Sequence, residues 1–577
     1  MEIKNRLTLL RNLLAEQDIS AMIIPSNDPH FGEYVPDYYK TIEWLTGFTG
    51  EAGTLVVAQE SAALWTDSRF FVQAEAQLQG TGVQLMKLKV EGTPSIQQWL
   101  KENLEEGDIV AMDEELFSYQ EYSSMVDELS PLTPSLIEDP FDVIWEDRPS
   151  LQFNPIRYVD ETITGESVAS KHSRLVDRLS GPVPFAYIVT ALDEICWLCN
   201  IRGTDVEYNP LVLSYAVVTP ENIHLFLMEQ MMEASAINIL SEQGVIFHPY
   251  EEIVKFLTNL PKDCIRIYSS GKISAKNFFA SMENIHRNAP FAPYAADPMT
   301  GGVLANMKAV KNEVELAGFR RAYVEDAKAQ IKFFNWIKEN VNNGITEYQA
   351  ALKLIEFRSE CPDYLGESFP PIVAYGPNAA LPHYGPSEEV SSVILPKGFL
   401  LIDTGAHYTY GTTDTTRTLA VGELTQEQKD DYTAVLKGMI NLSMAKFNKG
   451  TRGAQLDMLA RGPIMARGKI YWHGTSHGIG HNLCVHEGPQ SIRMEENSVS
   501  LALGMVLSNE PAVYIVGEYG IRIENTIVVA PWMKNDFAEF YQFETLNVLP
   551  INTEPINYDM LDEPHKQWLE EYNSRCL

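Results

Sequence analysis

The sequence predicts an α/β protein of several domains, in which one domain type occurs twice and a longer C-terminal segment follows. The length of 577 residues is too great for one hydrophobic core, so two to four domains are expected. The order helix, strand, aromatic helix, glycine turn and hairpin occurs twice, which indicates two copies of one α/β domain. The C-terminal segment, of about 270 residues, contains apolar strands that carry carboxylates.

The composition is that of a soluble globular protein. Hydrophobic residues make up 45% of the chain and aromatic residues 10%, which argues against long disordered tracts. The net charge of -34 would repel nucleic acids and anionic membrane surfaces, so we expect neither as a partner. No apolar run reaches the roughly eighteen residues that a membrane-spanning helix requires.

The N-terminus and the cysteines bear on the cellular compartment. The first fourteen residues have leucines at helical spacing with basic residues between them, and they lack the continuous apolar stretch of a signal peptide. Six cysteines in so long a chain do not make a disulfide framework. Cys196 and Cys199 have no second pair that would complete a zinc site, so core packing is favoured. We therefore expect a cytoplasmic protein.

The two copies can be traced element by element. The first follows the N-terminal helix with segments at residues 21–24, 43–47, 54–57 and 62–65. The second begins with a helix at residues 165–179 and continues at residues 186–189, 195–198, 211–218 and 223–228. Neither copy holds a cluster of His, Asp and Glu typical of a catalytic site. We place these domains at residues 1–157 and 158–305, and the C-terminal domain at residues 306–577.

Linkers and helices indicate the limits of the domains. Residues 140–154, rich in Pro and Asp, read as one linker, and residues 298–302 as a second break. A short helix at residues 568–572 is expected to close the chain. A long helix is expected from about Asn312, with an apolar stripe made of Leu316, Phe319, Tyr323, Ala327, Ile331 and Phe334.

Residues 398–418 hold the first two candidate ligands. Asp403 ends an apolar run that predicts a buried strand, and Asp414 lies in a Thr-rich run. The two-residue period of a strand puts Asp414 on one face with Thr412, Thr416 and Thr418. A buried aspartate without a partner costs several kcal/mol or becomes protonated, so two of them in one core require a cation.

Three further residues complete a candidate metal site. His477 follows His473 by four residues in HGTSHGIG, where glycines break a helix and the glutamate of an HExxH motif is absent. We therefore expect an extended segment that presents one histidine and leaves the other as a neighbour. Glu510 follows an apolar run at a strand end. Glu524 shares a strand face with Arg522 and is either paired with it or bound to metal.

Two aspartates, one histidine and two glutamates suit two adjacent divalent ions. Carboxylates bridge metals, and four negative charges balance two dications. Metals about 3.5 to 4 Å apart would hold a hydroxide between them, with its pKa lowered towards neutrality. Oxygen-rich ligation with a single imidazole favours a hard ion such as Mn²⁺, with Zn²⁺ or Co²⁺ as alternatives.

These residues lie in motifs that resemble those of the pita-bread metallopeptidases, in particular the long, three-domain form of aminopeptidase P. The likeness extends over essentially the whole chain and includes TDSRF, TALDE and RGTD in the N-terminal half. It implies an α/β and α+β architecture, with two creatinase-type N-terminal domains followed by a pita-bread catalytic domain. The C-terminal motifs that carry it are IDTGAHYTYGTTDTTRT, HGTSHGIG, VHEGP, SNEPAVY and GIRIEN.

The resemblance also implies a role for each candidate ligand. Asp403 would bind one metal, whereas His477 and Glu510 would bind the other. Asp414 and Glu524 would bridge both. Glu510 is the candidate for accepting the proton of the nucleophile, because it need hold only one metal and keeps an oxygen free.

Four accessory residues follow from the same resemblance. His383 would lie near the leaving nitrogen, and His486 would polarise the scissile carbonyl. His473 would line the pocket around the proline. Arg522 would contact the bridging carboxylates without itself binding metal.

The predicted function is the release of an N-terminal residue from Xaa-Pro peptides by a dinuclear metal centre with a bridging hydroxide. A prolidase, acting on Xaa-Pro dipeptides alone, is disfavoured because the prolidases that we compare carry one N-terminal domain. A metal-free, creatinase-like hydrolase is disfavoured because all five ligands are present. A non-catalytic pita-bread module that binds peptides is the alternative from another class. Expected partners are peptides with proline second and, by resemblance, a second copy in a homodimer.

Overall fold

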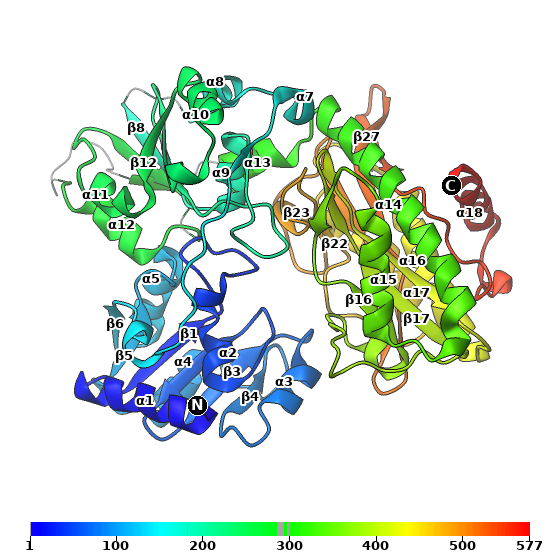
Figure 1. The fold of residues 1–577 in the computed structure, drawn as a ribbon, viewed down its shortest axis with the longest axis horizontal. Coiled ribbons are helices and arrows are strands. Elements are labelled where there is room, and N and C mark those ends of the chain that lie inside the picture. Colours follow the sequence, from blue (N-terminus) through cyan, green and yellow to red (C-terminus); the bar gives the residue numbers. More distant parts are fainter. Residues whose placement is uncertain (1, 180, 182, 270, 286–293, 297–300) are drawn as a thin grey trace. The chain divides into compact units, whose positions relative to one another are not determined.

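The computed structural model describes residues 2–179, 181, 183–269, 271–285, 294–296 and 301–577. The chain forms two compact units (Figure 1). The first comprises Met1–Tyr158 and Ser167–Pro298, and the second Val159–Glu166 and Met299–Leu577. The break predicted at residues 298–302 falls largely outside the described residues, and the three domain limits stay predictions.

The first copy of the repeat contains a six-stranded sheet with the order β4-β3-β2-β1-β5-β6. The central strand β1 pairs antiparallel with β2 and parallel with β5. The outer pairs β3–β4 and β5–β6 are parallel. The strands are β1 (Ala21–Pro25), β2 (Thr54–Ala58), β3 (Ala62–Thr66), β4 (Gln84–Lys87), β5 (Ile109–Asp113) and β6 (Thr133–Ile137).

The second copy has the equivalent order, β12-β11-β10-β8-β13-β14, with the same strand directions, which confirms the predicted repeat. The strand predicted at residues 211–218 begins later, at Tyr215, because the Leu213 N–H donates to Asp205 Oδ2 (2.8 Å) instead of to a neighbouring strand. The strands are β8 (Phe185–Val189), β10 (Tyr215–Val218), β11 (Ile223–Leu227), β12 (Val245–Pro249), β13 (Ile265–Tyr268) and β14 (Tyr294–Ala296).

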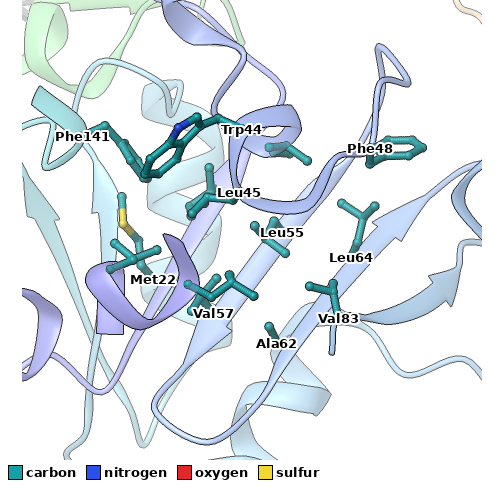
Figure 2. Packing of buried hydrophobic residues seen from close by; sticks show 14 of the residues in the cluster. Met22, Trp44, Leu45, Phe48, Leu55, Val57, Ala62, Leu64, Val83 and Phe141 are labelled. Carbon is teal, nitrogen blue, oxygen red and sulfur yellow. The ribbon is translucent and has the colours of Figure 1, made fainter. Parts of the chain in front are cut away.

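Apolar residues cover the faces of the first sheet, as expected for strands enclosed between helices. Met22 on β1 lies with Leu55 and Val57 of β2 in one cluster, to which Trp44 also belongs (Figure 2). Trp44 also stacks on Trp145, with ring centroids 5.0 Å apart. The alternate strand residues form a second cluster on the opposite face. The periodic apolar sequence therefore accounts for the position of this sheet.

The four helices predicted in the first unit, at the N-terminus and at residues 43–47, 165–179 and 195–198, are present, and the unit contains further helices that were not predicted. Capping boxes at Ser95 and Ser118 start two of them. Cys196 and Cys199 are free and buried, in keeping with core packing. The helices are α1 (Ile3–Glu16), α2 (Thr41–Thr46), α3 (Phe71–Gln77), α4 (Ile96–Asn103), α5 (Tyr119–Glu128), α6 (Phe141–Ile144), α8 (Val168–Leu179), α9 (Leu192–Leu198), α10 (Ala234–Glu242), α11 (Ile253–Thr258) and α12 (Ala275–Met282).

The second unit combines several sheets, whose orders are β15-β18-β19, β16-β17-β20, β21-β28-β27-β24-β22-β23 and β25-β26. The strands are β15 (Tyr364–Glu367), β16 (Ile372–Tyr375), β17 (Phe399–Thr404), β18 (Ala406–Tyr408), β19 (Gly411–Thr412), β20 (Thr415–Ala420), β21 (Lys446–Asn448), β22 (Ser476–Gly478), β23 (Glu487–Ile492), β24 (Val506–Asn509), β25 (Ala512–Ile515), β26 (Tyr519–Arg522), β27 (Asn525–Lys534) and β28 (Glu539–Thr545). The helices are α7 (Glu161–Thr164), α13 (Val303–Ala309), α14 (Glu313–Asn340), α15 (Glu347–Ser359), α16 (Gln426–Ser443), α17 (Asp457–Met465) and α18 (Glu563–Arg575).

The long helix α14 starts as predicted, with Asn312 as its N-cap in a capping box. Its buried stripe follows the prediction in the first half, but in the second half Gln330 and Phe333 are buried in place of Ile331 and Phe334. The two halves pack in different clusters, the second against β16, β17 and α15, so the buried face shifts along the helix. None of the described helices is both long and apolar enough to cross a membrane.

Candidate metal centre

The five predicted ligands all lie at strand ends or in short strands of the second unit. Asp403 is the last residue but one of β17, and His477 is the middle residue of β22. Glu510 directly follows β24. Asp414 lies between β19 and β20, and Glu524 lies between β26 and β27.

The continuous strand predicted through Asp414 is wrong, because the ladder breaks just before it. The Asp414 N–H donates to the hydroxyl of Tyr323 on α14 (3.1 Å) and not to a neighbouring strand. Thr526 Oγ1 in turn donates to the Asp414 carbonyl (3.2 Å). The carboxylate therefore comes from a break in the backbone pairing that side chains stabilise.

The five side chains meet at one place. Oxygen atoms of Asp403, Asp414 and Glu524 lie within 4.8 Å of one another, and so do ligand atoms of His477, Glu510 and Glu524. Because Glu524 belongs to both groups, the site consists of two overlapping parts, as two adjacent ions need. In the part of the chain that the structure describes, every such group lies in the second unit.

His477 shows what kind of partner the centre needs. Its Nδ1 lies 3.0 Å from the Gly478 carbonyl and so carries the proton that this hydrogen bond needs. Nε2 is then directed at Asp414 Oδ2 and Glu510 Oε1, both 3.3 Å away. A lone pair facing two carboxylates requires a proton or a metal ion between them. Without metal, burial lowers the pKa of His477, but Asp414 and Glu510 outweigh it and raise the pKa to about 9.

The carboxylates exceed the cations around them. Asp403 Oδ1 and Glu524 Oε1 are buried, and neither accepts a hydrogen bond from a described residue. Burial and the charge of Asp414 raise the pKa of Glu524 well above its ordinary value, and burial raises the pKa of Glu510 as well. These carboxylate ligands fit divalent cations, which would take the place of the missing hydrogen-bond donors.

Arg522 contacts a different carboxylate from those that the resemblance implied. Its Nε donates to Asp403 Oδ2 (3.0 Å), and Nη2 contacts the same oxygen. Of the two alternatives for Glu524, pairing with Arg522 is not observed among the described contacts, since the donor to Glu524 Oε2 is Thr416 Oγ1 (2.7 Å). Strand β26 ends at Arg522, so the strict alternation that would have put both side chains on one face does not hold.

His473 and His477, four residues apart, both reach the centre. His473 Nδ1 lies 2.7 Å from the Gly474 carbonyl, which leaves Nε2 to accept from the Tyr514 hydroxyl at 3.0 Å. Burial and the charge of Arg522 lower the pKa of His473 to about 3, so this ring is neutral at pH 7. The Tyr514 hydroxyl also accepts from Arg522 Nη1, which links His473 to the Asp403 side of the centre.

The other two predicted histidines lie near other histidines of the centre. The rings of His486 and His477 are edge to face, with centroids 4.4 Å apart, and His486 offers a ligand atom within 4.8 Å of those of Asp414 and His477. His383 lies near enough to His473 for its charge to affect the pKa of that ring. The carbonyl of the preceding Pro382 is 3.4 Å from Arg522 Nη2.

Sequence reasoning missed three residues that hold this site together. Thr416 was assigned to the correct face of its strand, but its hydrogen bond to Glu524 could not be foreseen. Tyr323 was counted as an apolar core residue of α14, and Tyr514 was not singled out. The signal for Tyr514 was its place in SNEPAVY, four residues after Glu510.

Comparisons with known proteins agree with this geometry. The model of metallopeptidase family M24 matches residues 317–531, and creatinase/prolidase N-terminal domain models match residues 6–139 and 147–315. A probable Xaa-Pro aminopeptidase P of Fusarium vanettenii is 37% identical over 603 residues, with 100% of this chain and 96% of the relative covered. The chain belongs to the aminopeptidase P family of M24 metallopeptidases.

Other members extend the match. A probable Xaa-Pro aminopeptidase P of Coprinopsis cinerea is 34% identical, covering 99% of this chain and 94% of the relative. The crystal structure of X-prolyl aminopeptidase from Caenorhabditis elegans, described as a cytosolic enzyme with a di-nuclear active site, has a TM-score of 0.92 at 32% identity and covers 100% of this chain and 95% of that one. The predicted aminopeptidase P fold, two creatinase-type domains followed by a pita-bread catalytic domain, is thereby confirmed.

Proposed function

We propose that the chain is a metal-dependent aminopeptidase that hydrolyses the peptide bond between an N-terminal residue and a following proline. The observation that carries this proposal is the set of four acids and one histidine, which meet within 4.8 Å in two overlapping groups. Full-length relatives named Xaa-Pro aminopeptidase P support the choice of substrate. The presence of all five ligands argues against a non-catalytic peptide-binding module.

The cofactor that we propose is a pair of divalent ions, held by Asp403, Asp414, His477, Glu510 and Glu524. Support comes from the two overlapping ligand groups and from the di-nuclear active site of the Caenorhabditis elegans relative. Four carboxylates and one imidazole favour Mn²⁺, with Zn²⁺ or Co²⁺ as alternatives. When bound, the ions would polarise the scissile carbonyl and lower the pKa of the attacking water.

The protein's own groups would do the rest of the chemistry. Glu510 is the proposed proton acceptor: its Oε1 accepts from Ser508 Oγ (3.2 Å), whereas Oε2 lies 4.0 Å from His473 Nδ1 and stays available. His486, beside His477, would donate a hydrogen bond to the oxyanion of the tetrahedral intermediate. Neutral His473, fixed by Tyr514, would line the proline pocket without adding charge.

Arg522 and His383 complete the proposed machinery. Arg522 would hold Asp403 in one rotamer through its Nε bond and, by its charge, offset part of the excess of acid. His383 would contact the proline nitrogen as the leaving group departs. Because a proline amide carries no N–H, ordinary proteases that require that donor act on it poorly, and a pocket shaped for the ring supplies the specificity.

Turnover of a small peptide panel tests the activity. We expect cleavage of Xaa-Pro-Xaa with Mn²⁺, loss of cleavage after chelation, and slow or absent cleavage of Xaa-Ala-Xaa. Equal rates on the proline and alanine peptides would contradict the proline specificity. Cleavage of the Xaa-Pro dipeptide alone, with the tripeptide untouched, would instead identify a prolidase.

Assembly and location are further parts of this proposal. We propose a homodimer, by likeness to the family, and sedimentation showing a monomer at micromolar concentration would overturn it. A cytoplasmic location is proposed because the Caenorhabditis elegans relative is described as cytosolic. Fractionation that finds the protein in a membrane or secreted fraction would overturn the location.

A further inference from the structure

Asp414 and Glu524, the two proposed bridging carboxylates, come from different sheets. Asp414 precedes β20, which belongs to the β16-β17-β20 sheet, whereas Glu524 precedes β27, which belongs to the six-stranded sheet. One backbone hydrogen bond joins the two segments directly, from the Glu524 N–H to the Thr416 carbonyl (3.1 Å). Because both acids lie in breaks between strands, regular pairing does not fix the distance between them.

Asn547 joins these two segments through one side chain. Its Nδ2 donates to Oγ1 of Thr415, the residue after Asp414 (2.7 Å), and its Oδ1 accepts from the N–H of Thr526, two residues after Glu524 (2.6 Å). Asn547, Thr415 and Thr526 are each at most 1% exposed. Both hydrogen bonds are therefore out of water, where their loss leaves a buried donor unsatisfied.

Neighbouring contacts hold the segment that carries Asn547. The Leu546 N–H donates to the Thr526 carbonyl (2.9 Å). Buried Arg417, on β20, donates to the carbonyls of Leu549 (2.7 Å) and Glu524 (2.5 Å). It also donates to the hydroxyl of Tyr572 on α18 (2.9 Å). Through Arg417 and Thr526, residues 546–549 are thus tied to β20, which follows Asp414, and to the segment that carries Glu524.

We propose that Asn547 is a positioning residue that sets the separation of Asp414 and Glu524, and with it the affinity for a pair of divalent ions. The inference rests on the proposed function in that it assigns these acids to metal. It also gives the region matched by the model of the M24 C-terminal region, residues 539–577, a role in positioning the ligands of the centre. Asn547 touches neither substrate nor metal in this proposal.

The test replaces Asn547 with leucine, which has a similar shape but neither hydrogen-bonding group. We expect Asn547→Leu to weaken Mn²⁺ binding to the metal-free protein by about tenfold or more, as for other residues that orient ligands. Titration calorimetry measures the dissociation constants and the number of ions bound. For an Xaa-Pro-Xaa peptide at a fixed Mn²⁺ concentration, kcat should fall by a similar factor and KM should stay within about twofold.

Asn573→Leu is the matched control. Asn573 lies on α18 in the same region, where its Oδ1 accepts from the Ile551 N–H (2.9 Å) and its Nδ2 donates to the Ile551 carbonyl (3.3 Å). We expect this variant to bind Mn²⁺ like the wild type even where its melting temperature falls. Equal weakening of Mn²⁺ binding in both variants would overturn the proposal, and so would wild-type affinity in Asn547→Leu.

Thr415→Val tests the same hydrogen bond by changing the acceptor, Thr415, in place of the donor, Asn547. It removes the acceptor of the Asn547 amide, keeps the shape of the side chain, and serves as the deciding variant if Asn547→Leu does not fold. We expect weaker Mn²⁺ binding, and an effect that does not add to that of Asn547→Leu in the double variant. Wild-type affinity in Thr415→Val, or strict additivity, would count against the proposal. If wild-type protein binds two ions but spares proline peptides, the proposed function fails while these affinities still decide the role of Asn547.

Discussion

Two buried groups of acids in the second unit differ in what neutralises them. Asp326 and Glu367 share the guanidinium of Arg358, whose Nε is 2.8 Å from Asp326 Oδ1 and whose Nη1 contacts Glu367. Gln330 donates to the second oxygen of Asp326 (2.8 Å), and the Tyr364 hydroxyl donates to that of Glu367 (2.8 Å). Every carboxylate oxygen of this group, which we call the arginine-paired network, has a protein donor.

The candidate metal centre has the opposite balance. Four carboxylates, of Asp403, Asp414, Glu510 and Glu524, share one guanidinium, that of Arg522, and the nearby histidine rings are not full cations unless protonated. Two buried oxygens, one on Asp403 and one on Glu524, accept no hydrogen bond from a described residue. Buried acids that the protein itself satisfies indicate a structural role, whereas an excess left unsatisfied indicates a ligand set. The difference yields predictions in which the two groups respond in opposite ways.

The largest effect is expected for Asp414→Asn. The change removes a shared oxygen ligand, so we expect Mn²⁺-dependent cleavage of an Xaa-Pro-Xaa peptide to fall by about 10³-fold or more. The metal-free variant should melt no lower than metal-free wild type, because one of the crowded buried carboxyl groups no longer carries a charge. Steady-state kinetics and thermal melting in chelator measure the two responses.

Asp363→Asn is the matched control for that variant. Asp363 is a partly exposed acid of the same unit that pairs with the exposed Arg321, so activity and melting temperature should stay close to wild type. Unaltered turnover in Asp414→Asn would remove the centre from the mechanism. A lower melting temperature of its metal-free form would show that Asp414 is satisfied in the way the arginine-paired network is.

The next largest effect is expected in the arginine-paired network itself. Arg358→Met leaves Asp326 and Glu367 buried without their cation, which costs about 3 kcal/mol or more. Because no metal takes part in this network, the loss should be equal with Mn²⁺ and with chelator. Urea unfolding under both conditions measures it. A loss that Mn²⁺ abolishes would mean that the two groups are not independent.

The same contrast explains what could be predicted from the sequence. Apolar runs locate β17 and β24, and the motifs around them locate His477 and Glu510, because ligand type and strand ends are local properties. The lack of hydrogen-bond donors to the two buried oxygens, by contrast, is not a local property of the sequence. The unpaired oxygen of Glu524 reflects the pairing of Arg522 with Asp403, which is 119 positions away, in place of its near neighbour Glu524.

The remaining misses have the same physical origin. Asp414 was assigned to a continuous strand, but a tyrosine hydroxyl on α14 replaces the ladder there. Asn547 lies in a segment without regular structure, and its sequence neighbours give no sign of the two threonines that it joins. Where contacts between separate sheets decide a residue's role, a pattern along one strand carries no information about it.

The pH dependence of stability should also separate metal-free from metal-bound protein. The raised pKa of His477, about 9 against an ordinary 6.5, gives stability that is complete below pH 6.5 and is lost as pH rises through 9. The raised pKa of Glu524 has the same sign, because stability present below about pH 4.5 is lost as pH rises through the folded-state value. Metal-free protein should therefore lose stability with rising pH.

Bound metal should reverse that trend, because the ligands must be deprotonated to bind and affinity rises with pH. We expect the difference in unfolding free energy between Mn²⁺ and chelator to widen by on the order of 2 kcal/mol from pH 6 to pH 9. Melting curves at fixed free Mn²⁺ measure it. A difference that narrows with pH would show that the acids of the centre are satisfied without metal.

The smallest effect is expected for an ion pair at the surface. This pair tests whether burial or ion pairing itself makes the arginine-paired network structural. Arg320 and Glu544 form two hydrogen bonds of 2.9 and 3.0 Å, with side chains 44% and 39% exposed. Their geometry is as favourable as that of the arginine-paired network, but water solvates either partner alone. Arg320→Gln should therefore cost less than about 1 kcal/mol in urea unfolding. A loss of stability near that of Arg358→Met would mean that ion pairing itself, and not burial, makes the network structural. The two unpaired buried oxygens of the centre would then no longer indicate a ligand set.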